Sequence, residues 1–141
     1  MDWRIEDKQA FSILAMKRHF NEENAGKGIP AFYKEYSKSD LKYKVAPKIG
    51  VCITPDLGAD WIYAIGDIFY NGLVCPDGFE AIEIKAKQWA VFSGDTSEKI
   101  MNYIYSDWFI NSGYEILPGE TLEFYNENGE IYEIWIPSSK R

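Results

Sequence analysis

The segment Ile62-Tyr63-Ala64-Ile65-Gly66 has a close counterpart in the second half of the chain, Ile131-Tyr132-Glu133-Ile134-Trp135. A strand repeated at this separation predicts a small α/β unit that is used twice within one domain, 1–141, over roughly residues 1–70 and 79–141. Two such units are expected to leave a cleft between them. The copies also differ, because Glu123 stands in the second half where the first half has Gly50. One half would therefore bring a negative charge to the cleft.

The predicted elements follow the order strand, helix, strand, strand in both halves. In the first half we expect a strand pattern over 5–20, a helix over about 30–39 that begins at Pro30, and strands over 48–54 and 61–69 joined by a turn at 55–58. In the second half we expect strands over 79–85 and 88–92. A helix with an Asp95–Glu98 capping box should follow, and then a hairpin of 121–126 with 130–137 that turns at Asn128-Gly129. Within that helix, Ile100, Ile104 and Trp108 form one apolar stripe.

The composition restricts the classes of partner. Fifteen Lys and Arg against 22 Asp and Glu give a net charge of −7, which repels phosphate backbones and argues against nucleic-acid binding. The sequence shows neither a signal peptide nor an apolar run long enough to cross a bilayer, and its two cysteines lack CxxC spacing. With one histidine, a multi-imidazole zinc site is impossible. We expect a cytoplasmic protein without a cofactor or metal.

Aromatic residues make up 16% of the chain, with ten tyrosines and five tryptophans. Part of this content must form the core, since aromatic rings bury large areas. The high aromatic content has two possible explanations: a core rich in aromatic rings, or a pocket lined by them.

The closing hairpin predicts the surroundings of Glu123. With a two-residue turn at 128–129, Tyr125 pairs with Tyr132 and Glu123 pairs with Ile134. Alternation then places Glu123, Tyr125, Tyr132, Ile134 and Ile136 on one face of the sheet. A longer loop would shift this register.

By the internal repeat, Tyr63 and Ile65 take the places of Tyr132 and Ile134 and line the opposite wall. A carboxylate among such neighbours is costly to ionise without a partner. Glu123 could pair with a lysine or arginine, accept hydrogen bonds from tyrosines, lie at an exposed strand edge, or await a cationic ligand that the rings also attract.

Several segments, taken in order, resemble the GyrI-like family. In the second half they are Trp89-Ala90-Val91-Phe92, Asp107-Trp108, Ser112-Gly113-Tyr114-Glu115, Pro118, Glu123-x-Tyr125 and Ile134-Trp135-Ile136-Pro137. In the first half they are Ile29-Pro30, Phe32-Tyr33 and Ile49-Gly50-Val51. The resemblance covers nearly the whole chain. It implies an α+β fold in which duplicated β-α-β-β units form an antiparallel sheet, with helices on one face and a cleft between the halves.

The resemblance also implies a function. The same domain is the effector-binding part of some AraC- and MerR-type regulators, and its cleft holds an acidic residue ringed by aromatics. The glutamate two places before a tyrosine is that acid, which here matches Glu123. The family would also place Trp89, Trp108, Phe32 and Tyr33 close to the cleft, although each could equally be a core residue.

We therefore expect a stand-alone protein that binds lipophilic, cationic or aromatic small molecules and has no helix-turn-helix of its own. Two alternatives remain open, because some members resemble hydrolases and one is a gyrase inhibitor. Glu123 would be the acid or base of a hydrolase that acts on reactive toxins. A modulator of DNA gyrase, or a partner of a regulator, would use the acidic surface instead. A serine or cysteine nucleophile is not expected, because His19 is the only histidine and lies beside a charged loop.

Overall fold

The computed structural model describes residues 1–43, 45–53, 60–69 and 74–141. The strands in these ranges are β1 Asp2–Lys8, β2 Phe11–Phe20, β3 Ile49–Ile53, β4 Trp61–Phe69, β5 Glu80–Ile84, β6 Lys87–Ser93, β7 Tyr114–Ile116, β8 Thr121–Tyr125 and β9 Ile131–Lys140. The helices are α1 Ala25–Tyr43, α2 Ser97–Tyr103, the π-helical turn η1 Ile104–Trp108 and α3 Phe109–Asn111. None of these helices, within the described ranges, is long and apolar enough to cross a membrane.

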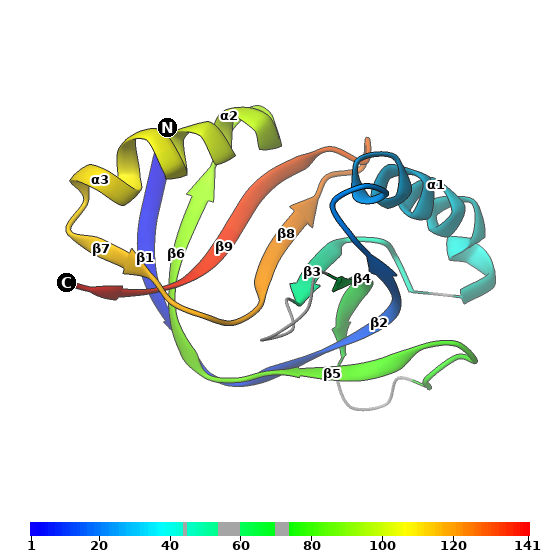
Figure 1. Ribbon diagram of the computed structural model, residues 1–141. Helices are drawn as coiled ribbons and strands as arrows, with labels where there is room; N and C mark the ends of the chain where they lie inside the picture. The colour runs from blue at the N-terminus through cyan, green and yellow to red at the C-terminus, as the bar shows by residue number, and fades with distance from the viewer. Residues whose placement is uncertain (44, 54–59, 70–73) are drawn as a thin grey trace.

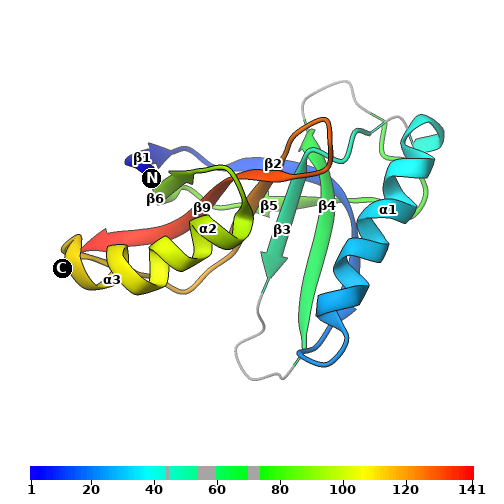
Figure 2. The same cartoon turned by 90° about the horizontal axis from the view of Figure 1, so that it is seen from above.

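The strands form one antiparallel sheet in the order β1-β6-β9-β8-β3-β4-β2-β5, with β7 added to β9. The pair β3 and β8 joins the two halves of the chain in the middle of this sheet. Helix α1 lies over the half that contains β4, and the α2–η1–α3 segment lies over β9 and β6, on the same side of the sheet (Figures 1 and 2). The predicted α+β fold, with an antiparallel sheet and helices on one face, is confirmed.

The outer strands are exchanged between the halves. Strand β1 leads into β2 but pairs with β6, and β5 leads into β6 but pairs with β2. The sequence pattern predicted a single strand over 5–20, which is wrong: the chain leaves the sheet at residues 9 and 10, and two strands result. The charges at Glu6, Asp7 and Lys8 mark the end of the first strand, which is mostly exposed at the edge of the sheet.

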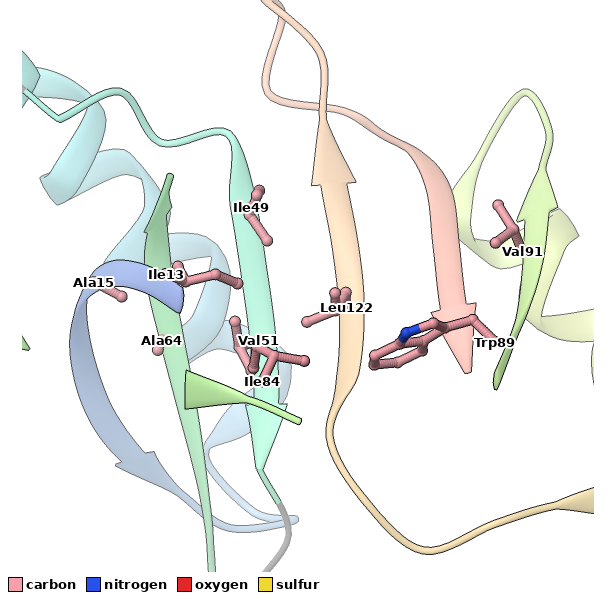
Figure 3. Packing of buried hydrophobic residues seen from close by; sticks show 9 residues of the cluster. All are labelled: Ile13, Ala15, Ile49, Val51, Ala64, Ile84, Trp89, Val91 and Leu122. Atoms are coloured by element: carbon pink, nitrogen blue, oxygen red, sulfur yellow. The ribbon is translucent and has the colours of Figure 1, made fainter. Parts of the chain in front are cut away.

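The face without helices is covered by the sheet itself, which curls around a core of alternating strand residues. This core contains Ile13, Val51, Leu122 and Trp89, all fully buried. Figure 3 shows the Trp89 ring reaching from one side of the curl towards Leu122 on β8. Two further cores lie beneath the helices, one under α1 and one under α2 and η1.

Helix α1 begins earlier than the pattern predicted. Pro30 was expected at its first turn, but the helix starts at Ala25. The reason is a reciprocal cap: the Asn21 side chain accepts hydrogen bonds from the amides of Glu23 and Asn24, and the Asn24 side chain accepts one from the Asn21 amide. Polar residues assigned to a loop thus start the helix, in the manner of a capping box.

The second helical segment has the predicted apolar stripe but a different cap. Thr96, rather than Asp95, accepts the hydrogen bond from the Lys99 amide. Ile100, Ile104 and Trp108 are all buried. In an ordinary α-helix, side chains four residues apart are rotated relative to each other around the helix axis. The wider π-helical turn η1 reduces this rotation, so the three side chains stay on one face of the helical segment.

The closing hairpin has the predicted pairing of Glu123 with Ile134 but not the predicted pairing of the tyrosines. A bulge between Phe124 and Tyr125 sets Tyr125 opposite Ile131. Tyr132 is consequently 44% exposed.

The connection is longer than the two residues assumed. The Asn126 side chain accepts hydrogen bonds from the amides of Asn128 and Glu130, so that residues 127–129 form the loop. Gly129 supplies the left-handed backbone, at φ 78°. In the first half, residue 54 and the predicted turn at 55–58 lie outside the described residues.

Candidate functional site

The site begins at a glycine that lies opposite a glutamate. Gly50 on β3 pairs with Glu123 on β8, at the junction of the two halves. A Cβ atom at position 50 would lie 2.6 Å from Cζ of Tyr63 and 3.2 Å from Cε2 of Tyr125. The missing side chain therefore leaves room for two phenol rings to lie over the junction.

Three tyrosines are in contact around this point. The buried Tyr63 and Tyr125 share a hydrogen bond between their hydroxyl groups. Tyr33, on α1, stacks on Tyr125 with a centroid separation of 4.4 Å and an interplanar angle of 29°. Burial, followed by the nearby charge of Glu123, raises the pKa of Tyr63 well above its usual value. Burial also raises the pKa of Tyr125, so the hydroxyls of Tyr63 and Tyr125 are neutral hydrogen-bonding groups at physiological pH.

Glu123 is partly buried by surface area, yet its carboxyl is desolvated. Burial raises the pKa of Glu123, and a hydrogen bond with the Tyr63 hydroxyl lowers it only in part. Within the described part of the chain, Glu123 forms no ion pair with a lysine or arginine. Of the arrangements that the sequence left open, the described residues show the Tyr63 hydroxyl acting on the Glu123 carboxyl and show no ion pair between Glu123 and a lysine or arginine.

Two cavities adjoin the stacked rings. One, of about 450 Å³, lies between the first turns of α1, the start of α2 and the tip of the β8–β9 hairpin. The other, of about 660 Å³, lies between α1, the chain that leads into β3 and the β8 side of the same hairpin loop. Both volumes are in the range of small-molecule sites. Tyr33 and Tyr125 are the residues that line both cavities.

The structure brings four of the predicted site residues together: Glu123, Tyr63, Tyr125 and Tyr33. Tyr132 lines the larger cavity, although the hairpin bulge moves it away from its predicted partner. Ile134 is paired with Glu123 across the hairpin, and Ile65 is paired with Gly50. Both isoleucines are buried beneath the helices, one in each half.

Of the ten predicted site residues, Tyr33, Tyr125 and Tyr132 line the cavities. The remaining three predicted residues lie neither at the cavities nor at the junction of Gly50 with Glu123. Trp89 lies in the same core as Leu122. Leu122 is adjacent to Glu123 on β8, and adjacent strand residues point to opposite faces, so Trp89 lies on the face of the sheet opposite to Glu123. Trp108 is 1% exposed, and its ring contacts those of Trp3, Phe92 and Tyr114.

Phe32 is 2% exposed beneath α1, and the Arg18 guanidinium lies 4.7 Å from its ring centroid. Like the two tryptophans, it is a packing residue.

Sequence reasoning missed most of the smaller cavity. Its lining includes Ile29, Pro30, Thr96, Ser97 and Ile131. The predicted helix of 30–39 included Pro30 but not Ile29, and the sequence carries no signal that the first turns of α1, the start of α2 and the hairpin tip lie together. These three segments lie together because β3 pairs with β8. The local sequence of either strand does not predict that pairing.

Comparison with known proteins identifies the class. Residues 1–139 match the model of the GyrI-like small molecule binding domain, so this chain belongs to that family of small-molecule-binding domains. Comparison with curated proteins gives no match.

Solved structures share the fold at low sequence identity. The protein SAV2435, solved bound to tetraphenylphosphonium, is 17% identical with a TM-score of 0.77, over 99% of this chain and 94% of that one. A putative transcription regulation protein from Staphylococcus aureus MU50 is 16% identical with a TM-score of 0.73, over 99% of both chains. A hydrolase from Listeria innocua is 10% identical with a TM-score of 0.54, over 97% of this chain and 91% of that one.

Proposed function

We propose that this protein binds lipophilic cations that carry aromatic rings, in the cleft between its halves, with Glu123 as the group that selects positive charge. One observation carries the proposal: a desolvated carboxylate lies beside tyrosine rings and has no cationic partner among the described residues. A bound cation would supply the missing charge.

Charge and rings would act together on such a ligand. A desolvated carboxylate attracts a cation more strongly than an exposed one does, because little water screens the pair. Each tyrosine face adds cation–π attraction of about 0.5–2 kcal/mol. An anionic compound of the same shape would be repelled, so charge discrimination is the expected signature of the site.

Apolar contact would supply most of the remaining affinity. The smaller cavity is lined largely by apolar surface, including Ile29, Pro30 and Ile131. Burial of about 200 Å² of ligand surface contributes on the order of 5 kcal/mol before the costs of association. A micromolar dissociation constant needs about 8 kcal/mol after those costs, so the charge and ring terms must supply the difference. We expect dissociation constants of about micromolar or weaker, with broad selectivity. The tetraphenylphosphonium bound to SAV2435 is a compound of this kind.

The test compares two ions of nearly equal shape and opposite charge. Tetraphenylphosphonium and tetraphenylborate are titrated into the wild-type protein and into Glu123→Gln by calorimetry. We expect the wild type to bind the cation and not the borate, and Glu123→Gln to lose most of that preference while it remains folded by circular dichroism. Glu115→Gln, which removes an exposed carboxylate on β7, is the matched control and should behave as the wild type does.

Equal affinity of wild type and Glu123→Gln for the cation would refute the role of Glu123. Inhibition of DNA gyrase by a protein that binds neither ion would favour the protein-partner function instead.

A second candidate function, hydrolysis of reactive electrophiles, is favoured by the raised pKa of Glu123 and its hydrogen bond with Tyr63. A carboxyl group with a raised pKa can transfer protons near neutral pH. Incubation with an aromatic epoxide, followed by mass spectrometry, should then show a hydrated product that Glu123→Gln fails to form. Its absence with the wild-type protein would count against this candidate for that substrate class.

A further inference from the structure

The Tyr33 ring divides the cleft. It stacks on Tyr125, and these two rings alone among the described residues line both cavities. Glu123 lines neither cavity as the described residues define them. In this arrangement, a molecule in either cavity therefore lies beside the stacked rings and not beside the carboxylate.

Tyr33 is held less firmly than the neighbouring tyrosines. The Tyr36 hydroxyl donates to the Val45 carbonyl at 2.8 Å, and the hydroxyls of Tyr63 and Tyr125 bond to each other. The Tyr33 hydroxyl makes no hydrogen bond to any other described residue, and the side chain is only partly buried. If the Tyr33 ring leaves, stacking and van der Waals contacts are lost but no hydrogen bond is broken.

The hairpin tip leaves space for the ring. A Cβ atom at Gly129 would lie 2.9 Å from Cε1 of Tyr33, so the bare glycine backbone forms the surface against which the ring rests. The ring of Tyr33 thus lies between the hairpin tip and the face of Tyr125. Tyr125 in turn lies over Gly50, the residue that pairs with Glu123. This is where a flat cationic ring would gain both stacking and the charge of the carboxylate.

We propose that Tyr33 is a place-holder: its ring occupies the position that an aromatic ring of the ligand takes, and the ligand displaces it. Displacement joins the two cavities and opens the way to Glu123. The preferred ligands are then cations with several rings, because a single-ring amine can enter one cavity without moving Tyr33 and so does not reach the carboxylate. This inference rests on the proposed binding function and assigns a size selectivity to it.

The test measures tetraphenylphosphonium binding to Tyr33→Ala by calorimetry and by stopped-flow fluorescence. Removal of the competing ring should tighten binding about 2- to 12-fold, the range that corresponds to the loss of one aromatic pair. The observed association rate of the wild type should reach a plateau as the ligand concentration rises, because movement of Tyr33 becomes limiting. That plateau should disappear in Tyr33→Ala. Tyr33→Phe should behave as the wild type does, since the hydroxyl bonds to no described residue.

The controls separate this inference from the binding function. Tyr105→Ala removes an exposed ring on η1 and should leave both the affinity and the rates unchanged. Weaker binding by Tyr33→Ala, with normal binding by the wild type, would refute the place-holder and leave the binding function intact. If neither protein binds, both proposals fail. If Tyr33→Ala does not fold, Tyr33→Leu preserves apolar bulk without stacking and must show the same tightening.

Discussion

Gly50 offers the sharpest test of how the site is built. In Gly50→Ala the new methyl group would lie 2.6 Å from Cζ of Tyr63 and 3.2 Å from Cε2 of Tyr125, and neither ring has free space to retreat because both are buried. Overpacking of this kind costs about 1–3 kcal/mol. For a chain of this length the melting temperature should fall by roughly 3–9 °C. The ring shift would also disturb the hydrogen bond between Tyr63 and Glu123, so affinity for a cationic ligand should fall as well.

The assay is urea denaturation, with the same measurement on Gly26→Ala as control. Gly26 lies in α1, and a Cβ atom there would have no neighbour within 4 Å, so this substitution should stabilise the protein by about 0.4–1 kcal/mol. Tyr63→Leu supplies a second comparison, because the shorter side chain removes the ring that the methyl group meets. In that background Gly50→Ala should cost much less.

The reasoning is refuted if Gly50→Ala is as stable as the wild type. It is equally refuted if the cost of the substitution is the same in the Tyr63→Leu background, since the destabilisation would then have another origin.

Three further outcomes are expected. Burial raises the pKa of Glu123 in the folded state, so the contribution of Glu123 to the free energy of unfolding falls as pH rises through that pKa. The stability of Glu123→Gln relative to the wild type, measured by thermal denaturation, should therefore increase as the pH rises above the ordinary range of a glutamate. Burial alone would raise the pKa of Glu120. The hydrogen bond from Lys87, with Nζ 2.6 Å from Oε2, a backbone hydrogen bond and the charges of Lys87 and Lys85 together outweigh burial and lower that pKa. Lys87→Met should therefore cost about 1 kcal/mol at pH 7, and urea titrations should show this difference shrinking as pH falls through the lowered pKa. Trp108→Ala should cost about 3–5 kcal/mol in urea denaturation, because the ring is buried beneath α2 and η1; a cost below 1 kcal/mol would show that Trp108 is not a core residue.

Local patterns predicted the parts of the fold that neighbouring residues determine. The strand at 61–69 and the apolar stripe ending at Trp108 follow from short-range alternation. The predicted pairing of Glu123 with Ile134 is present because the extra loop residue and the bulge before Tyr125 offset each other. The predicted pairing of Tyr125 with Tyr132, next to the turn, is wrong. The Asn126 side chain closes a three-residue loop where a two-residue turn was assumed. A single polar side chain thereby changed the partner of Tyr125.

The site could be predicted only in part, because residue type does not distinguish a core ring from a cleft ring. Trp89 and Tyr125 both occupy strands of alternating apolar residues, yet they lie on opposite faces of the sheet. Tyr33 and Phe32 are adjacent in α1, and only Tyr33 reaches the cavities. Which of them faces the ligand depends on the rotation of α1 about its axis, which its packing against the sheet determines.

The exchange of β1 and β5 between the halves limits how the cleft can open. Each half donates one strand to the sheet of the other, and β3 pairs with β8 between them. A hinge that swung the halves apart would break three backbone ladders at once, whose many hydrogen bonds make that motion far more costly than a rotation of one side chain. We therefore expect the sheet to stay rigid when a small molecule binds, and neither half should be stable as a separate fragment.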